Sequence, residues 1–116
     1  HGGAAMPLVA SGTAMSEALA VMTEKRLGCV GVVDADGRLA GMITDGDVRR
    51  NLSDGLLTRR ADEIMTRRPK TVRPDTLLAR AIEMLSSASI TALFVLDDGR
   101  PVGIVHMHDL LRAGVA

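Results

Sequence analysis

An internal repeat constrains the fold of this chain more than any other feature. The segment GMITDGDVRRNL, which begins at Gly41, returns in imperfect form as GIVHMHDLLRAGV, which begins at Gly103. Two copies of one small unit, each too small to bury its own core, are expected to pack against each other and to leave two related clefts. The recurring positions are Gly41, Thr44, Asp47 and Arg50 in the first copy and Gly103, His106, Asp109 and Arg112 in the second.

The repeat also covers the segments that precede these motifs. MSEALAVM and LARAIEML carry apolar residues at i, i+3, i+4 and i+7, which is the helical period. CVGVVDADGR and ALFVLDDGR are β-rich runs closed by Asp/Gly turns, and LAGMIT and PVGIVH supply the second arms of two hairpins. Short extended pieces are expected at Pro7–Ala10 and Lys70–Arg73, before the long helices. A short helix follows each hairpin, so each copy is predicted to be a βαββα unit.

Capping and domain boundaries complete the predicted organisation. Gly12 or Thr13 is expected to cap the first long helix and Asp75 the second. A further short helix is expected over Ala61–Met65. The fold class is therefore α/β (α+β), with two βαββα repeats packed about a pseudo-twofold axis. The boundaries are a cloning scar at 1–5, the first repeat at 6–58, a connector at 59–68 and the second repeat at 69–116; the start HGGAAM indicates a piece cut from a longer protein.

Composition narrows the functional class. The net charge is zero and the pI is near 7, so no overall field draws the chain to nucleic acid or to a membrane. The sequence shows no signal peptide and no apolar run of about 20 residues that could span a bilayer. The lone Cys29 lies in an apolar strand and is predicted to be a small core residue. One cysteine allows no internal disulfide, which fits a reducing, cytoplasmic location.

The recurring Thr44 and Asp47, and their counterparts His106 and Asp109, lie at strand-to-helix junctions. A hydroxyl followed three residues later by a carboxylate resembles a capping box, which is a structural role. A helix start also offers unpaired amides that suit phosphate, and a nearby carboxylate can accept hydrogen bonds from ribose hydroxyls. Both interpretations are compatible, and the residues alone leave them open.

Basic residues cluster around the connector. Arginine suits bidentate recognition of phosphate or carboxylate, whereas a solvated connector would instead pair its arginines with Asp62 and Glu63. Lys70 and Arg73 flank the strand that leads into the second repeat and are the ones expected to face a cleft. The cluster holds six of the fourteen Lys and Arg: Arg59, Arg60, Arg67, Arg68, Lys70 and Arg73.

Metal-dependent and nucleophilic chemistry find little support. His106 and His108 are two residues apart, and such positions on a helix point away from each other. No serine or cysteine lies in a nucleophile elbow, and glycine patterns for phosphate loops or dinucleotides are absent. This fragment is therefore predicted to hold no metal, no cofactor and no catalytic residues.

The motifs resemble a known family. Two βαββα units that each close with G-h-h-T/H-x-x-D are similar to a tandem pair of CBS domains, also called a Bateman module. The runs TDGDVRR and HMHDLLRAGV resemble the C-terminal module of bacterial D-arabinose 5-phosphate isomerases of the KpsF/GutQ family. The resemblance implies that a sugar-isomerase domain lies upstream in the parent chain and is absent here. That enzyme makes arabinose 5-phosphate for Kdo, the acidic sugar of lipopolysaccharide.

The resemblance also implies a ligand. CBS pairs bind nucleotides between their repeats, with the motif Thr on phosphate and the Asp on ribose. In the second repeat His106 replaces the usual Thr or Ser. The ligand is expected to be CMP-Kdo, sensed as a downstream product, or an adenine nucleotide; the alternative is an assembly module with vestigial clefts, and a homodimer is expected. The predicted nucleotide-binding residues are Thr44, Asp47, Lys70, Thr71, Val72, Arg73, Thr91, His106 and Asp109.

Overall fold

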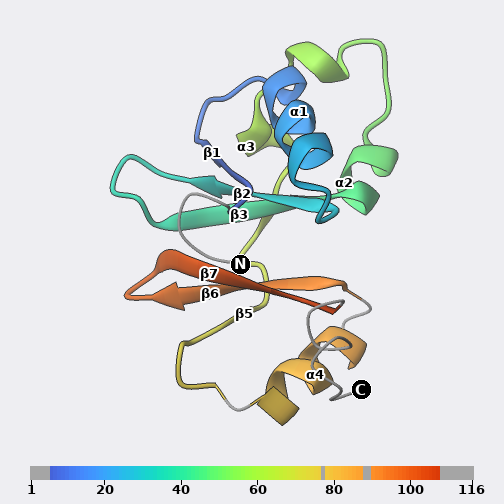
Figure 1. The fold of residues 1–116 in the computed structure, drawn as a ribbon. Coiled ribbons are helices and arrows are strands. Elements are labelled where there is room, and N and C mark those ends of the chain that lie inside the picture. Colours follow the sequence, from blue (N-terminus) through green and yellow to red (C-terminus); the bar gives the residue numbers. More distant parts are fainter. Residues whose placement is uncertain (1–5, 77, 88–89, 108–116) are drawn as a thin grey trace. The chain divides into compact units, whose positions relative to one another are not determined.

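The chain forms two compact units in the computed structural model, which describes residues 6–76, 78–87 and 90–107. The N-terminal unit is Pro7–Pro69, and the C-terminal unit contains the residues from Lys70 onward together with Met6. Figure 1 shows that each unit has its own sheet and helical structure of its own. The segment 59–68, predicted to be a connector, lies within the N-terminal unit.

The N-terminal unit has a four-stranded sheet in the order β1-β2-β3-β4. Strand β1 runs parallel to β2, whereas β2–β3 and β3–β4 are antiparallel. Its elements, in chain order, are β1 (Leu8–Ala10), α1 (Met15–Lys25), β2 (Cys29–Val33), β3 (Leu39–Thr44), α2 (Asp45–Arg50), the 3₁₀ helix η2 (Leu56–Thr58), α3 (Ala61–Ile64) and β4 (Thr66–Arg67).

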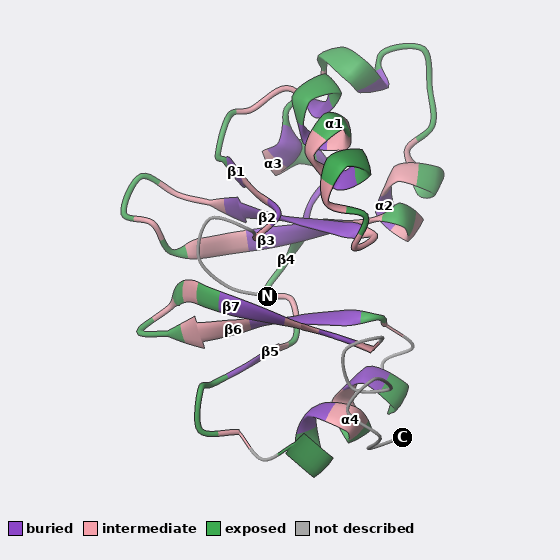
Figure 2. Cartoon of the chain, in the orientation of Figure 1, coloured by how far each residue is buried: buried purple, intermediate pink, exposed green. Residues whose placement is uncertain are grey.

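One face of this sheet and the apolar stripe of α1 build the core of the N-terminal unit. Val30 and Val32 lie two residues apart on β2 and therefore point to the same face, where they pack with Met15, Ala18 and Met22. The apolar residues that repeat with the helical period are thus the ones that α1 buries. Figure 2 shows the buried strands of this sheet beside helices that keep exposed outer sides.

The C-terminal unit repeats this plan with a three-stranded sheet in the order β5-β6-β7. Leu93 of β6 packs with Ala81 and Leu85 of α4 and with Val72 of β5. The described elements are β5 (Thr71–Val72), α4 (Leu78–Ser87), β6 (Ala92–Asp97) and β7 (Arg100–His106). The short helix predicted after His106 falls on residues 108–116, which lie outside the described residues.

Three strands of each unit match in order and pairing, which confirms the internal repeat, and β4 has no counterpart in the described part of the C-terminal unit. Cys29 pairs with Thr44 in one hairpin, and Ala92 pairs with His106 in the other. Each hairpin also has an irregularity at the same place, after Val32 in β2 and after Val95 in β6. The shared register means that Thr44 and His106 end equivalent strands.

The start of α1 differs from the prediction. Its N-cap is Ala14, whose side chain makes no capping bond, so the predicted caps Gly12 and Thr13 are wrong. The physical reason is a long-range contact: Ala14 forms an isolated bridge with Arg60, and the Met15 N–H donates to the Arg59 carbonyl at 2.8 Å. The predicted cap Asp75 precedes α4, but residue 77 lies outside the described residues, so that cap stays a prediction.

The connector holds more structure than the sequence suggested. The predicted helix at Ala61–Met65 is confirmed as α3, which ends one residue earlier. Strand β4 was not predicted, and it pairs Thr66 with Met42 and Arg67 with Gly41 of β3.

None of the helices that the structure describes combines the length and the apolar character needed to cross a bilayer.

Candidate functional site

The first predicted site centres on the junction between β3 and α2. Thr44 ends β3 in an extended conformation and is the N-cap of α2. Its hydroxyl accepts a bond from the Asp47 N–H at 3.3 Å, and Asp47 Oδ2 accepts one from the Thr44 N–H at 3.0 Å. This reciprocal pair is a capping box, because each side chain satisfies a backbone donor that the first helical turn leaves unpaired. The structural interpretation of the motif is therefore confirmed.

The Asp47 carboxylate is buried and accepts bonds from several donors. Only 5% of the residue is exposed. Oδ2 also accepts a bond from the Thr44 hydroxyl at 3.2 Å. Oδ1 accepts one from Arg50 at 2.6 Å and one from the Thr66 hydroxyl at 3.0 Å. The Asp47 carboxylate is thus hydrogen-bonded to residues of β3, α2 and β4.

The turn from α1 into β2 forms one border of this junction. Gly28 has a φ of 74°, and its carbonyl accepts a bond from the Asp45 N–H at 3.2 Å. A Cβ at Gly28 would lie 3.3 Å from Asp45 Oδ2, so both the backbone angle and the space favour glycine. Burial, with a smaller contribution from the Asp45 charge, raises the pKa of the neighbouring Cys29 thiol to about 12. Cys29 is therefore a protonated, buried core residue, as predicted.

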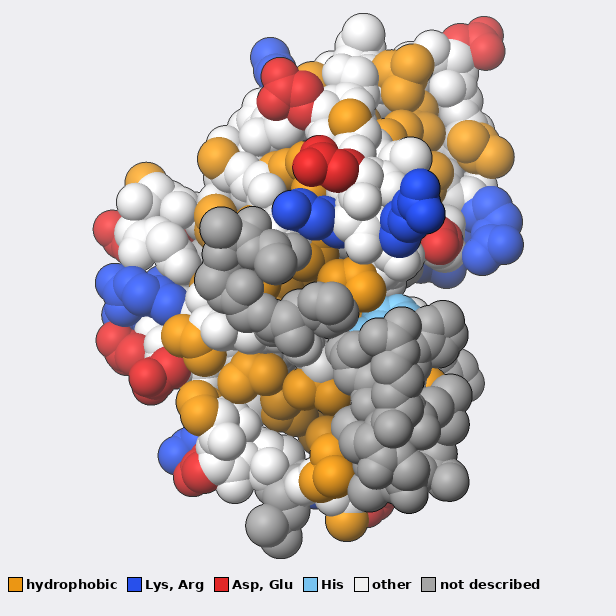
Figure 3. Space-filling model, in the orientation of Figure 1, with side chains coloured by type: hydrophobic (Ala, Val, Ile, Leu, Met, Phe, Trp, Pro, Cys, Tyr) orange, Lys and Arg blue, Asp and Glu red, His pale blue; other side chains and the backbone are white. Residues whose placement is uncertain are grey.

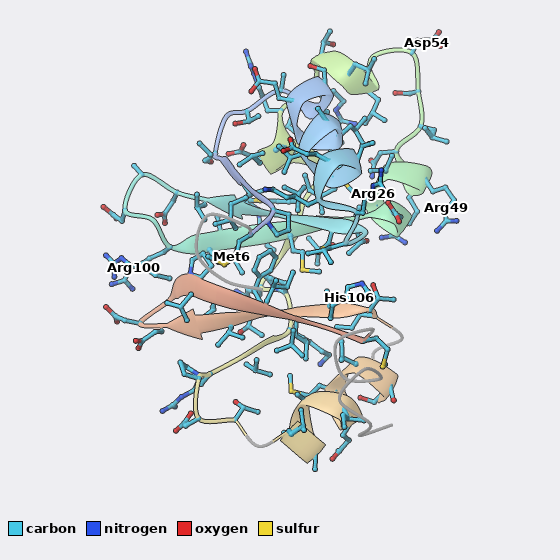
Figure 4. The ribbon with its side chains drawn as sticks, in the orientation of Figure 1. Met6, Arg26, Arg49, Asp54, Arg100 and His106 are labelled. Carbon is cyan, nitrogen blue, oxygen red and sulfur yellow. The ribbon has the colours of Figure 1, made fainter. Side chains whose placement is uncertain are left out.

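The equivalent junction of the C-terminal unit contains His106 and Thr91. His106 ends β7 with 7% of its surface exposed, and its position is marked in Figure 4. The Met107 N–H donates to the Thr91 carbonyl at 2.8 Å, which matches the bond from Asp45 to Gly28. The structure thus brings Thr91 and His106 to one end of the sheet. Asp109, predicted to complete this junction, lies outside the described residues.

The predicted residues of β5 lie elsewhere on the same sheet. On β6, Val95 pairs with Val72 of β5, and Ala92 pairs with His106 of β7. Arg73, which follows Val72, therefore lies about four residues further along the sheet than His106, a distance of roughly 13 Å. The structure therefore does not bring Arg73 beside His106, and the exposed Lys70 precedes β5. Instead, Thr71–Asp75 and Leu96–Gly99 line a separate pocket of about 610 Å³.

Three of the six basic residues around the connector have local acidic or carbonyl partners. Arg59 lies 3.7 Å from Glu63, Arg60 donates to the Gly12 carbonyl at 3.2 Å, and Arg73 lies 3.6 Å from Asp75. In Figure 3, basic and acidic side chains alternate over the visible face of the N-terminal unit. These contacts favour the interpretation of Arg59 and Arg60 as structural residues of the surface.

No group of three or more His, Cys, Asp or Glu that could hold a metal ion occurs within residues 6–76, 78–87 and 90–107.

Sequence reasoning missed two residues that contact Asp47. Arg50 lies three residues after Asp47 on the same helix, and this spacing could have indicated the ion pair. Thr66 is nineteen residues away in sequence, and no local pattern points to it. Thr66 became recognisable only through its distance to the carboxylate.

Comparison with known proteins assigns the family. The family model of the CBS domain matches residues 5–54 and again residues 61–116. These two matches correspond to the two repeats and confirm the predicted resemblance.

The curated relatives link the chain to an isomerase. It is 48% identical over 118 residues to the arabinose 5-phosphate isomerase KdsD of Pseudomonas aeruginosa, covering 99% of this chain and 36% of that relative. The chain thus spans about a third of the length of the curated relatives it matches. Because two CBS domains occupy nearly all of its residues, these 116 residues contain no separate isomerase domain.

Solved structures share the same fold. CBSX2 in complex with AMP has a TM-score of 0.83 and 25% identity, covering 98% of this chain and 90% of that chain. The CBS domain pair of protein MJ0100, in complex with 5′-methylthioadenosine and S-adenosyl-L-methionine, has a TM-score of 0.79 and 30% identity, covering 93% and 87%. With its repeated strand register and its two family matches, this chain belongs to the CBS domain family, as two CBS domains in tandem.

Proposed function

We propose that this CBS pair is the regulatory, nucleotide-binding part of a bacterial D-arabinose 5-phosphate isomerase. The observation that carries the proposal is 48% identity to KdsD along almost the whole chain. The sugar-isomerase domain would lie upstream in the parent protein, which would act in the cytoplasm and supply arabinose 5-phosphate for Kdo and lipopolysaccharide.

The ligand we propose is a nucleotide with an intact ribose and phosphate. The AMP complex of CBSX2 supports this class, and the ligands of MJ0100, which have a ribose but no phosphate, support its nucleoside part. In the N-terminal unit, Thr44 would contact phosphate and Asp47 the ribose. In the C-terminal unit, His106 and Asp109 would take these roles beside Thr91. Lys70 and the segment Thr71–Arg73 belong to the same proposal, as a basic stretch for further anionic groups.

CMP-Kdo is the specific ligand we propose. It has the ribose and phosphate that the motif residues would recognise, and it adds a carboxylate that arginine or lysine can bind. As a downstream product it would report the output of the pathway to the isomerase. Such feedback requires CMP-Kdo to bind one conformational state of the whole enzyme more tightly than another.

A thermal-shift panel tests the proposal. AMP, ATP, S-adenosyl-L-methionine, CMP and CMP-Kdo are each added to the purified chain. A ligand at a hundred times its Kd stabilises the folded state by about 2.7 kcal/mol, which is a readily measured rise in Tm. A rise with CMP-Kdo that exceeds the rise with CMP supports product sensing, whereas a rise with AMP alone indicates an adenine-nucleotide sensor. If no compound raises Tm, the sensing role is rejected.

A second role, in assembly, is supported by exposed leucines. Leu52 lies in the segment between α2 and η2 and Leu57 lies in η2, with 68% and 54% of their surfaces exposed. Burial of such side chains against a second copy is favourable, and we propose that the chain forms a homodimer. Sizing by light scattering of wild type and of a Leu52→Ser, Leu57→Ser variant tests this. A dimer that becomes monomeric in the variant supports the role, and a monomeric wild type contradicts it.

A further inference from the structure

We propose that the Thr66 hydroxyl competes with the ribose of the ligand for Asp47, so that nucleotide binding releases Thr66 from the carboxylate. The inference rests on the proposed function, because it takes Asp47 as the ribose contact. It adds a positioning residue from β4, a strand that no sequence motif indicated, and it gives the site a direct connection to the segment between the two repeats.

The first step is the number of donors on Asp47. An ionised carboxylate has about four acceptor positions. In this chain Oδ2 accepts bonds from the N–H and the hydroxyl of Thr44, while Oδ1 accepts bonds from Arg50 and Thr66. The four donors fill these positions. A ribose that donates from its two neighbouring hydroxyls can therefore bind Asp47 only if two of the present donors leave.

The second step is which donor leaves. The bond from the Thr44 N–H belongs to the capping box and is fixed by the backbone of the same turn. The Thr44 hydroxyl leaves Oδ2 when it turns to the phosphate, as the proposed function requires, so the second position must come from Oδ1. Both other donors act on Oδ1. The Arg50 side chain is 69% exposed, but its short bond is assisted by the charges of both groups. Thr66 offers a neutral bond, which is weaker, and its side chain can rotate into solvent because the residue is exposed.

The third step is what the release would change. Thr66 begins β4, a strand of two residues that pairs with Met42 and Gly41 of β3. The bond to Asp47 therefore supplements a short ladder. After β4 the chain passes through Arg68, which has a φ of 53°, and then reaches Lys70, where the C-terminal unit begins. Loss of the Thr66 bond would loosen the attachment of the segment that joins the two units.

The test is calorimetric titration of AMP into wild type and Thr66→Val, with 2′,3′-dideoxy-AMP as the comparison ligand. Valine keeps the branched shape and removes only the donor. One net hydrogen bond corresponds to a change of about two- to tenfold, so AMP should bind Thr66→Val tighter by this factor. The dideoxy nucleotide, which cannot donate to Asp47, should bind both proteins equally. Thr66→Ser, which restores the hydroxyl, should return AMP affinity to the wild-type value.

Thr58→Val is the matched control, since Thr58 is an exposed threonine whose hydroxyl bonds to the Gly55 carbonyl at 3.0 Å and not to Asp47. Its AMP affinity should equal that of wild type. Equal or weaker AMP binding by Thr66→Val, with wild type binding AMP, would overturn the competition and leave the proposed function standing. If Thr66→Val binds AMP and wild type does not, the result supports the competition between Thr66 and the ribose. If no variant binds AMP, the same comparison of wild type with Thr66→Val is made with CMP-Kdo, and absence of binding of both nucleotides would overturn both proposals.

Discussion

Asp62 fastens the loop before α1 to α3, because its Oδ1 accepts a 2.6 Å hydrogen bond from the backbone N–H of Gly12, fifty residues away. The Ser11 hydroxyl donates to the other carboxylate oxygen. The Ala61 N–H donates to the Thr13 carbonyl at 2.7 Å, so side-chain and backbone bonds join the same two segments. These bonds join the first loop of the N-terminal unit to its last helix, α3.

The Asp62 contact makes stability depend on pH. The bond from Ser11, then the bond from Gly12, lower the pKa of Asp62 below its usual 3.8. A carboxyl whose pKa is lowered on folding stabilises the folded state above its unfolded pKa, and this contribution is lost as pH falls through the folded pKa. Asp62→Asn should therefore be less stable than wild type at about pH 7, and the difference should shrink as pH falls below about 3.8. Urea unfolding over this range measures it.

Asp54→Asn is the control for this titration. Asp54 is exposed on the loop after α2, where it is labelled in Figure 4. Its substitution should change the unfolding midpoint little at any pH. A constant difference between wild type and Asp62→Asn across the whole range would contradict the assigned role of Asp62.

Gly41→Ala should disrupt the pairing of β3 with β4. A Cβ at Gly41 would lie 2.5 Å from Met65 Sδ and 2.8 Å from the Thr66 carbonyl oxygen. The Met65 side chain can move, but the Thr66 backbone cannot move without breaking the ladder. We expect a loss of about 1–3 kcal/mol in the free energy of unfolding, as for other overpacked sites.

Gly55→Ala provides the matched comparison for Gly41→Ala. Nothing lies within 4 Å of a Cβ at Gly55, and its φ of −95° suits any residue. Chemical denaturation should find this variant as stable as wild type or slightly more stable. If Gly41→Ala and Gly55→Ala lost the same free energy of unfolding, the crowding at Gly41 would not be the cause of the destabilisation.

Asp47→Ala should destabilise the N-terminal unit as well as abolish nucleotide binding. The change removes the acceptor for the half-buried Thr44 N–H, which is one bond of the capping box, together with the bonds from the exposed Arg50 and Thr66, and loss of a helix cap is costly. We expect a loss of about 2 kcal/mol, measured by urea unfolding.

Asp45→Ala is the control in the same helical turn, because Asp45 is exposed. Its effect should stay within about 0.5 kcal/mol of wild type. If Asp47→Ala were no more destabilising than Asp45→Ala, the four-donor description of Asp47 would be wrong.

Cys29 should resist thiol reagents in the folded protein. Only 2% of the residue is exposed, and burial followed by the Asp45 charge raises its pKa to about 12, so the reactive thiolate is scarce at neutral pH. As the chain has a single cysteine, the rate of reaction with a disulfide reagent reports this position alone. The reaction should be slow in buffer and fast in urea, and rapid labelling without denaturant would contradict the burial of Cys29.

The sequence by itself determined the repeated order of strands and helices. The i, i+3, i+4, i+7 stripe of α1 is a local pattern, and α1 buries the face that it predicted against Val30 and Val32 of β2. The capping box of Thr44 and Asp47 was also readable, because its two members are three residues apart. Helix geometry alone places the side chain of each of these two residues beside the backbone N–H of the other.

The tertiary structure alone decided which distant segments meet these motifs. The bond from Thr66 to Asp47 spans nineteen residues, and the bond from Gly12 to Asp62 spans fifty. The start of α1 at Ala14 follows from its bridge to Arg60, which outweighed the local capping preference of Gly12 and Thr13. Such contacts depend on how the chain folds back on itself, and a pattern of neighbouring residues carries no information about that path.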